Sequence, residues 1–131
     1  MVAKKKIIPQ SKSSKLKILL VGAEVAPYAS VGGFSQVLGY LSRELYNLGH
    51  DVRLFMPKYG FIDEAEHDIH MLQEGLKVPT GDESNPNLVC NVKYAENVYG
   101  VKTYFLENKE YYEKRANVYG YVDDPTRFSL L

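Results

Sequence analysis

The sequence lacks several features that would assign it to a particular class of protein. Cys90 is the only cysteine among 131 residues, so no disulfide can form within the chain, and this usage predicts a reducing, cytoplasmic location. No apolar run approaches the roughly 18 residues that a membrane-spanning helix needs, so we expect no membrane partner. The amino-terminal region also lacks the apolar stretch of a signal peptide.

Charge of one sign is not in excess either. The chain has 16 basic and 16 acidic side chains, a net charge of zero and a pI near 6.8. Without a basic stripe interleaved with aromatic residues, nucleic acid is not an expected partner. With 45% hydrophobic residues, the composition is that of an ordinary globular domain.

The first sixteen residues differ from the rest in composition. They contain five lysines, several serines and no acidic residue, which cannot form a packed core. We therefore expect a flexible basic tail at residues 1–16 and a single, partial Rossmann-like domain over residues 17–131.

Residues 17–48 predict a strand, a glycine-containing loop and a helix in succession. The unbroken apolar run at 18–21 is typical of a strand buried on both faces of a parallel sheet. After Gly32 and Gly33, apolar residues spaced by three and four predict a helix near 33–48 whose buried stripe includes Leu41. The stripe comprises Phe34, Val37, Leu38, Leu41, Leu45 and Leu48.

The pair Gly32-Gly33 indicates an anion site, because backbone amides at a helix start suit a phosphate or carboxylate. A simple tight turn explains the same two residues. The spacing matches neither the dinucleotide fingerprint nor the P-loop, which leaves a hydride-transfer enzyme of the Rossmann type as the weakest interpretation.

The remaining pattern predicts an α/β fold, a three-layer Rossmann-like sandwich with a mainly parallel sheet. Further strands are expected near 51–56 and 101–107, and a hairpin excursion near 75–95. Asn108 predicts the cap of a short helix, and Asp124-Pro125 predicts the cap and first residue of another. Because that last helix would end within its second turn, we expect an incomplete domain.

Two groups of side chains have ambiguous patterns. His67 and His70 lie in an acidic turn, but without a third anchored ligand they predict no metal site. Tyrosine suits both carbohydrate stacking and core packing, and for five of the eleven tyrosines the spacing does not distinguish the two. These five are Tyr99, Tyr111, Tyr112, Tyr119 and Tyr121.

Several short motifs occur in one order along the chain. They are EVAPYA (24–29), GGF (32–34), GHDVR (49–53), MPKY (56–59), YFLEN (104–108), YGY (119–121) and RFSL (127–130). Together they resemble the amino-terminal part of the catalytic region of bacterial and plant glycogen and starch synthases, over residues 17–131.

The resemblance implies the incomplete amino-terminal half of a two-domain GT-B glycosyltransferase. Members transfer glucose from ADP-glucose or UDP-glucose to an α-1,4-glucan with retention of configuration, and need no cofactor. The implied partners are the nucleotide-sugar donor, the glucan acceptor and a carboxyl-terminal domain. An isolated piece of this length is therefore expected to be inactive, and it holds no predicted catalytic residue.

Site residues follow from the same resemblance. Residues Ser30, Gly32, Gly33 and Gln36 occupy the donor phosphate positions. The predicted cleft residues are Glu24, Tyr28, Lys58, Tyr59 and Tyr121.

Two of these positions depart from the family pattern. The family normally has a Lys at position 30 and an Asp at position 36, and a hydroxyl cannot supply the charge that a Lys offers to a diphosphate. The alternative interpretation is therefore a non-catalytic glucan- or nucleotide-binding module of the same ancestry.

Overall fold

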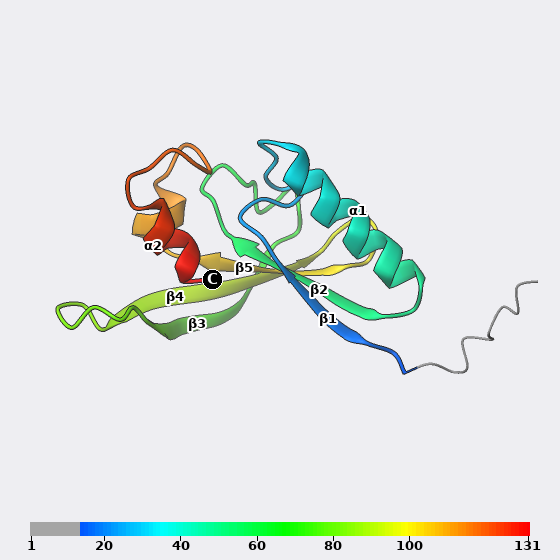
Figure 1. Ribbon diagram of the computed structural model, residues 1–131, viewed down its shortest axis with the longest axis horizontal. Coiled ribbons are helices and arrows are strands. Elements are labelled where there is room, and N and C mark those ends of the chain that lie inside the picture. Colours follow the sequence, from blue (N-terminus) through cyan, green and yellow to red (C-terminus); the bar gives the residue numbers. More distant parts are fainter. Residues whose placement is uncertain (1–13) are drawn as a thin grey trace, which may run out of the picture.

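The computed structural model describes residues 14–131, so the predicted tail lies almost wholly outside the described residues. The described chain forms one five-stranded sheet with the strand order β1-β2-β5-β4-β3 (Figure 1). The strands are β1 (Lys17–Val21), β2 (Asp51–Pro57), β3 (His70–Pro79), β4 (Asn87–Glu96) and β5 (Lys102–Glu107).

The sheet is mixed. Strands β1, β2 and β5 pair in parallel, whereas β5, β4 and β3 pair antiparallel. The expected strands and hairpin are therefore confirmed, but the sheet is not mainly parallel. The hairpin is an integral part of the sheet because β4 pairs directly with β5, with Tyr94 opposite Tyr104.

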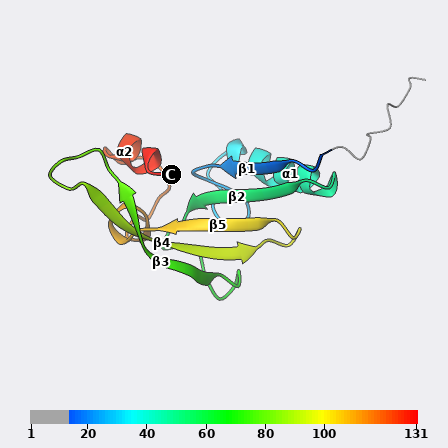
Figure 2. The ribbon, with the colours of Figure 1, turned by 90° about the horizontal axis from the view of Figure 1, so that it is seen from below.

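Helices cover one face of this sheet. Helix α1 (Gly33–Asn47) lies along it, while the π-helical turn η1 (Lys109–Glu113) and α2 (Asp124–Ser129) lie toward the carboxyl ends of the parallel strands. Figure 2 looks at the sheet from below and shows the opposite face without a covering helix. Two of the three expected layers are thus present among residues 14–131.

The buried face of α1 differs from the predicted stripe. Leu38 of the predicted stripe is buried together with Ser35 and Ser42, whereas Leu41 is 42% exposed. The two serines are small, and their hydroxyls donate to the carbonyls one turn earlier, so the helix can approach the sheet closely without leaving an unpaired polar group. Four members of the predicted stripe are exposed, namely Phe34, Val37, Leu41 and Leu48, whereas Leu38 is buried and Leu45 is partly buried.

This arrangement predicts losses of stability of different size for substitutions at two leucines that are three residues apart. We expect Leu38→Ala to lower the free energy of unfolding by about 2–4 kcal/mol, because it opens a cavity against the sheet. Leu41→Asp should lower it by less than about 1 kcal/mol, because the carboxylate stays in water. Urea denaturation of both variants would test this, and equal losses would contradict the assignment of the buried face.

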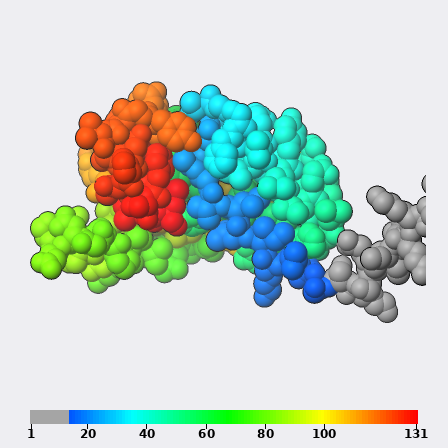
Figure 3. All heavy atoms as spheres, in the orientation of Figure 1, coloured from blue at the N-terminus to red at the C-terminus, as the bar shows by residue number. Residues whose placement is uncertain are grey.

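Strand β1 is also less buried than predicted. Among residues 14–131, β2 is the only strand that pairs with β1, so β1 lies at the edge of the described sheet, and the side chains of Leu19 and Val21 are exposed. Figure 3 shows that β1 (blue) and α1 (cyan to green) form adjoining parts of the same surface. An unpaired, apolar strand edge beside an apolar helix stripe is a surface that favours association.

The two short helical segments begin close to the predicted positions. The side chain of Asn108 accepts hydrogen bonds from the amides of Glu110 and Tyr111, which confirms the predicted cap. For α2 the N-cap is Asp123, one residue earlier than predicted. Asp124 instead accepts from the Gly120 amide and from the Arg127 guanidinium, and so closes the preceding loop onto the helix.

Candidate functional site

The loop between β1 and α1 is organised by one buried carboxylate. Glu24 is 3% exposed and accepts hydrogen bonds from the amides of Val31 (2.5 Å) and Gly32 (3.1 Å). A carboxylate is favourable at this position because it faces the positive end of the α1 dipole. Glu24 therefore sets the conformation of the loop that precedes the helix.

This interaction changes which amides can receive a ligand. The amide of Gly32 already donates to Glu24, so it is not free for a phosphate. The next two amides, of Gly33 and Phe34, belong to the first turn of α1, which has no intrahelical acceptors for them. No atom of residues 14–131 lies within 4 Å of a Cβ built on Gly33, so a ligand can approach the backbone there.

Ser30 and Gln36 lie near this helix end with different surroundings. The Ser30 hydroxyl is 2.6 Å from the hydroxyl of Ser35, which in turn donates to the Gly32 carbonyl. Ser30 is thus tied to the first turn of α1. Gln36 is exposed and lines a cavity together with Ser30, so the structure brings these two predicted residues together.

Two of the predicted cleft residues are part of the core instead. Tyr28 packs edge-on against Phe105, with ring centroids 5.0 Å apart, and burial raises the pKa of its phenol. Tyr59 is fully buried, donates to the Ala23 carbonyl at 2.6 Å, and has a pKa raised by burial. Their hydrophobic bodies fill space under the β1–α1 loop, so neither ring is a surface platform.

Lys58 is also buried, in a network of charges between the sheet and η1. Its ammonium donates to the Tyr59 carbonyl at 2.9 Å and lies 3.3 Å from Glu113. Nearby, Lys93 pairs with both Glu64 and Glu107. Burial alone would raise the pKa of Glu107, but Lys93 holds that pKa below its ordinary value.

These pairings satisfy the buried charges within the chain. Lys58 therefore supports η1 and does not reach a cleft.

Tyr121 lies between two arginines. The guanidinium carbons of Arg115 and Arg127 are 4.8 and 4.9 Å from its ring centroid. Its hydroxyl accepts a hydrogen bond from the Asn117 amide. The ring therefore holds the 115–121 loop together by cation–π contacts.

Two cavities flank residue 30, and their aromatic linings include residues outside the predicted site set. One of about 380 Å³ lies between Val31 and the 116–119 segment, which includes Tyr119. Burial raises the pKa of Tyr119, and the nearby Glu24 carboxylate adds to the shift. The other cavity is lined by Tyr40 and Tyr99. The sequence indicated Tyr99 and Tyr119 as candidates for stacking or core packing, whereas only the high tyrosine content pointed to Tyr40.

Among residues 14–131, no three His, Cys, Asp or Glu side chains come close enough to hold a metal ion. His67 packs against the Tyr28 ring, and His70 lies 2.8 Å from Asp68. Within the same described range, none of the helices has the length and apolar character needed to cross a membrane.

Comparison with known proteins defines the family. Residues 17–131 match the family model described as starch synthase catalytic domain, so the chain belongs to that family, as the motifs predicted. A glycogen synthase of Caldicellulosiruptor bescii is 40% identical over 120 residues, which are 88% of this chain and 23% of that protein. Glycogen synthase 1 of Geobacter metallireducens is 37% identical over 123 residues, or 89% of this chain and 24% of that protein.

The fold agrees with a solved member of the family. The catalytic domain of starch synthase IV from Arabidopsis thaliana, bound to ADP and acarbose, superposes with a TM-score of 0.77 at 26% identity. The match covers 89% of this chain and 24% of that one. The chain therefore spans about a quarter of the length of these relatives and corresponds to the amino-terminal part of a GT-B catalytic region.

Proposed function

We propose that this chain contributes the donor-side loop of a cytoplasmic, retaining glycosyltransferase that transfers glucose from ADP-glucose or UDP-glucose to an α-1,4-glucan. The observation that carries the proposal is the loop at residues 24–33, where Glu24 holds the backbone so that the first amides of α1 are open. Such amides, at the positive end of a helix, suit a diphosphate. The ADP and acarbose bound by the Arabidopsis relative support a nucleotide and a glucan as ligands.

In this proposal the residues of the loop have different roles. Gly33 permits close approach of the donor phosphates, Gln36 and Ser30 offer neutral hydrogen bonds, and Glu24 positions the loop without touching the donor. The charge for the phosphates, the groups that act on the reacting bond and the exclusion of water are then the task of a carboxyl-terminal domain.

One observation favours the second candidate, a non-catalytic binding module. Ser30 replaces the Lys implied by the family resemblance, and its hydroxyl is already engaged with Ser35. A binding module would retain glucan or nucleotide affinity without transfer. Activity measured in a complete two-domain context separates the two candidates.

The test is a chimera in which residues 17–131 replace the matching segment of the Caldicellulosiruptor bescii glycogen synthase. We expect the chimera to transfer labelled glucose from ADP-glucose to glycogen, and the 131-residue chain alone to transfer none. The unmodified relative is the control for the assay. A folded chimera without transfer would contradict the proposal of an enzyme and favour the proposal of a binding module.

Variants at the loop test the proposed donor contact in the same chimera. Gly33→Val should abolish donor binding while the fold stays intact, because the added side chain occupies the open space over the helix end. Ser30→Lys should tighten donor binding roughly tenfold, because a charge-assisted contact to phosphate is stronger than a neutral one. Ser30→Ala is the control for loss of the Ser35 contact, and calorimetry with ADP-glucose measures all three. Unchanged affinity in Gly33→Val would show that the loop is a simple turn that does not contact the donor.

A further inference from the structure

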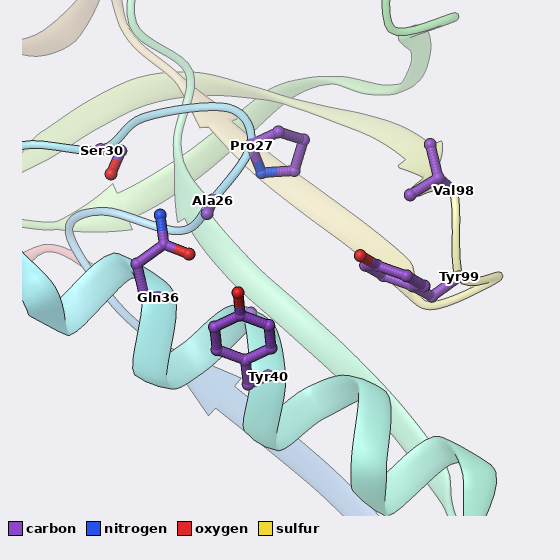
Figure 4. Close-up of a pocket in the computed structure, with 8 residues that line it drawn as sticks. Ala26, Pro27, Ser30, Gln36, Tyr40, Val98 and Tyr99 are labelled. Atoms are coloured by element: carbon purple, nitrogen blue, oxygen red, sulfur yellow. The ribbon is translucent and has the colours of Figure 1, made fainter.

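A cavity of about 410 Å³ lies beside α1, between the loop that follows β1 and the turn that joins β4 to β5. Figure 4 shows Tyr40 and Gln36 on the helix, Ala26 and Pro27 on the loop, and Tyr99 on the turn. We call this cavity the Tyr40–Tyr99 pocket. Its volume falls within the range of about 300–1,000 Å³ that is typical of small-molecule sites.

The two tyrosines are exposed and share one cation. Tyr40 is 55% exposed and Tyr99 is 47% exposed. The guanidinium carbon of Arg43 lies 5.0 Å from the first ring centroid and 5.2 Å from the second. Because Arg43 contacts both rings, it fixes them relative to each other.

The turn that presents Tyr99 is held by its own hydrogen bonds. The side chain of Asn97 accepts from the amides of Tyr99 and Val101, each at 3.0 Å. Gly100 has a φ of +82°, which favours glycine, and a Cβ there would lie 3.1 Å from the hydroxyl of Tyr46. The ring of Tyr99 is therefore preorganised, which lowers the entropy lost on binding.

The chemistry of the lining selects for a neutral ligand. None of the eight residues that line the pocket carries a charge at neutral pH. Arg43, next to the rings, is paired with Glu44 at 3.0 Å. Among the eight lining residues a diphosphate finds no cation, whereas a sugar can stack on a tyrosine ring and exchange hydrogen bonds with Gln36 and the tyrosine hydroxyls.

We propose that the Tyr40–Tyr99 pocket binds a segment of an α-1,4-glucan. The inference rests on the proposed function, in which that glucan is the acceptor, and it assigns the acceptor a place on this chain. Ser30 and Gln36 line the pocket and also lie next to the open amides of α1. A glucan in the pocket therefore passes directly beside the predicted donor loop.

Nuclear magnetic resonance titration of the 131-residue chain with maltoheptaose tests the proposal. We expect amide shifts at residues 98–100 and along the exposed side of α1 near Tyr40. Tyr99→Ala and Tyr40→Ala should each weaken binding by at least about fivefold, because each removes a stacking surface. Tyr99→Phe should retain most of the affinity, since the ring remains.

Matched controls test whether binding depends on the pocket itself. Tyr104→Ala removes a tyrosine on β5 that does not line the pocket, and it should leave binding unchanged. The β-linked cellohexaose should bind more weakly than maltoheptaose, because the proposed ligand is an α-linked chain. Circular dichroism of each variant confirms that it is folded.

Three results would overturn the proposal. They are the absence of shifts near Tyr99 with maltoheptaose, equal affinity in the folded alanine variants, and shifts at residues 98–100 with ADP in place of maltoheptaose. Failure of the proposed function is seen separately. An inactive chimera that still binds maltoheptaose through Tyr99 refutes only the transfer activity, and an active chimera that binds it independently of Tyr99 refutes only the pocket.

Discussion

Replacing Arg127 with methionine is expected to lower the free energy of unfolding by about 3–5 kcal/mol. Arg127 is fully buried, and its guanidinium donates to the carbonyls of Tyr111 and Val118 and to the carboxylate of Asp124. It thereby joins η1, the following loop and α2. Methionine fills a similar volume but leaves two carbonyls and one carboxylate without their donor.

Arg115 offers a matched control in the same segment. It makes a two-point ion pair with Asp123, with distances of 2.9 and 2.7 Å, but both side chains are partly exposed. Arg115→Met should therefore lower the free energy of unfolding by about 1 kcal/mol or less. Arg127→Lys should fall between the two arginine-to-methionine variants, because one ammonium replaces only part of the hydrogen bonding. Guanidinium denaturation measures the free energy of unfolding of all three variants. Equal losses for Arg127→Met and Arg115→Met would refute the assignment of Arg127 as the buried residue that joins η1, the loop and α2.

One nitrogen of the Arg127 guanidinium, Nη2, is buried without a hydrogen-bond partner among the described residues. The guanidinium carbon lies 4.9 Å from the ring centroid of Tyr121 and 5.0 Å from that of Phe128, so aromatic faces surround the charge. Cation–π attraction offsets part of the missing hydrogen bond.

Gly60→Ala is the second change with a large expected effect. A Cβ at this position would lie 2.1 Å from the carbonyl oxygen of Glu113 and 3.1 Å from its carbonyl carbon. Both atoms belong to the backbone at the end of η1, so no side-chain rotation relieves the clash. We expect a loss of at least about 3 kcal/mol, together with displacement of η1 from the sheet.

Gly33→Ala is the control for this substitution. In the described part of the chain no atom lies within 4 Å of a Cβ on Gly33, and the residue begins a helix, so the change should leave stability equal or higher by up to about 1 kcal/mol. Differential scanning calorimetry measures both variants. A Gly60→Ala protein that melts close to the parent temperature would show that η1 can separate from residue 60 without loss.

Both large effects concern the segment over the carboxyl ends of the parallel strands. Gly60 and Arg127 hold η1 and α2 in place, and these elements support the loop that carries Tyr119. Tyr119 lines the cavity beside Val31, next to the Glu24 carboxylate. Damage to either residue is therefore expected to disturb the candidate site as well as the core.

Local signals in the sequence determined most elements and the family. Apolar runs located β1, β2 and β5, Asn108 marked the start of η1, and the ordered motifs predicted the starch synthase family that the comparisons confirm. The Gly32-Gly33 pair located the start of α1 within one residue. These features depend on residues close together in the chain, so their pattern is visible without a fold.

Only the tertiary structure decided which faces are buried and which tyrosines are free. The apolar stripe predicted Leu41 inside, yet the buried face of α1 consists of Ser35, Leu38 and Ser42, because small side chains on either side of Leu38 allow close packing. Likewise, spacing did not distinguish Tyr59, which is buried under the β1–α1 loop, from Tyr99, which a hydrogen-bonded turn holds at the surface. Burial depends on partners distant in sequence, and a single residue's type and spacing do not specify them.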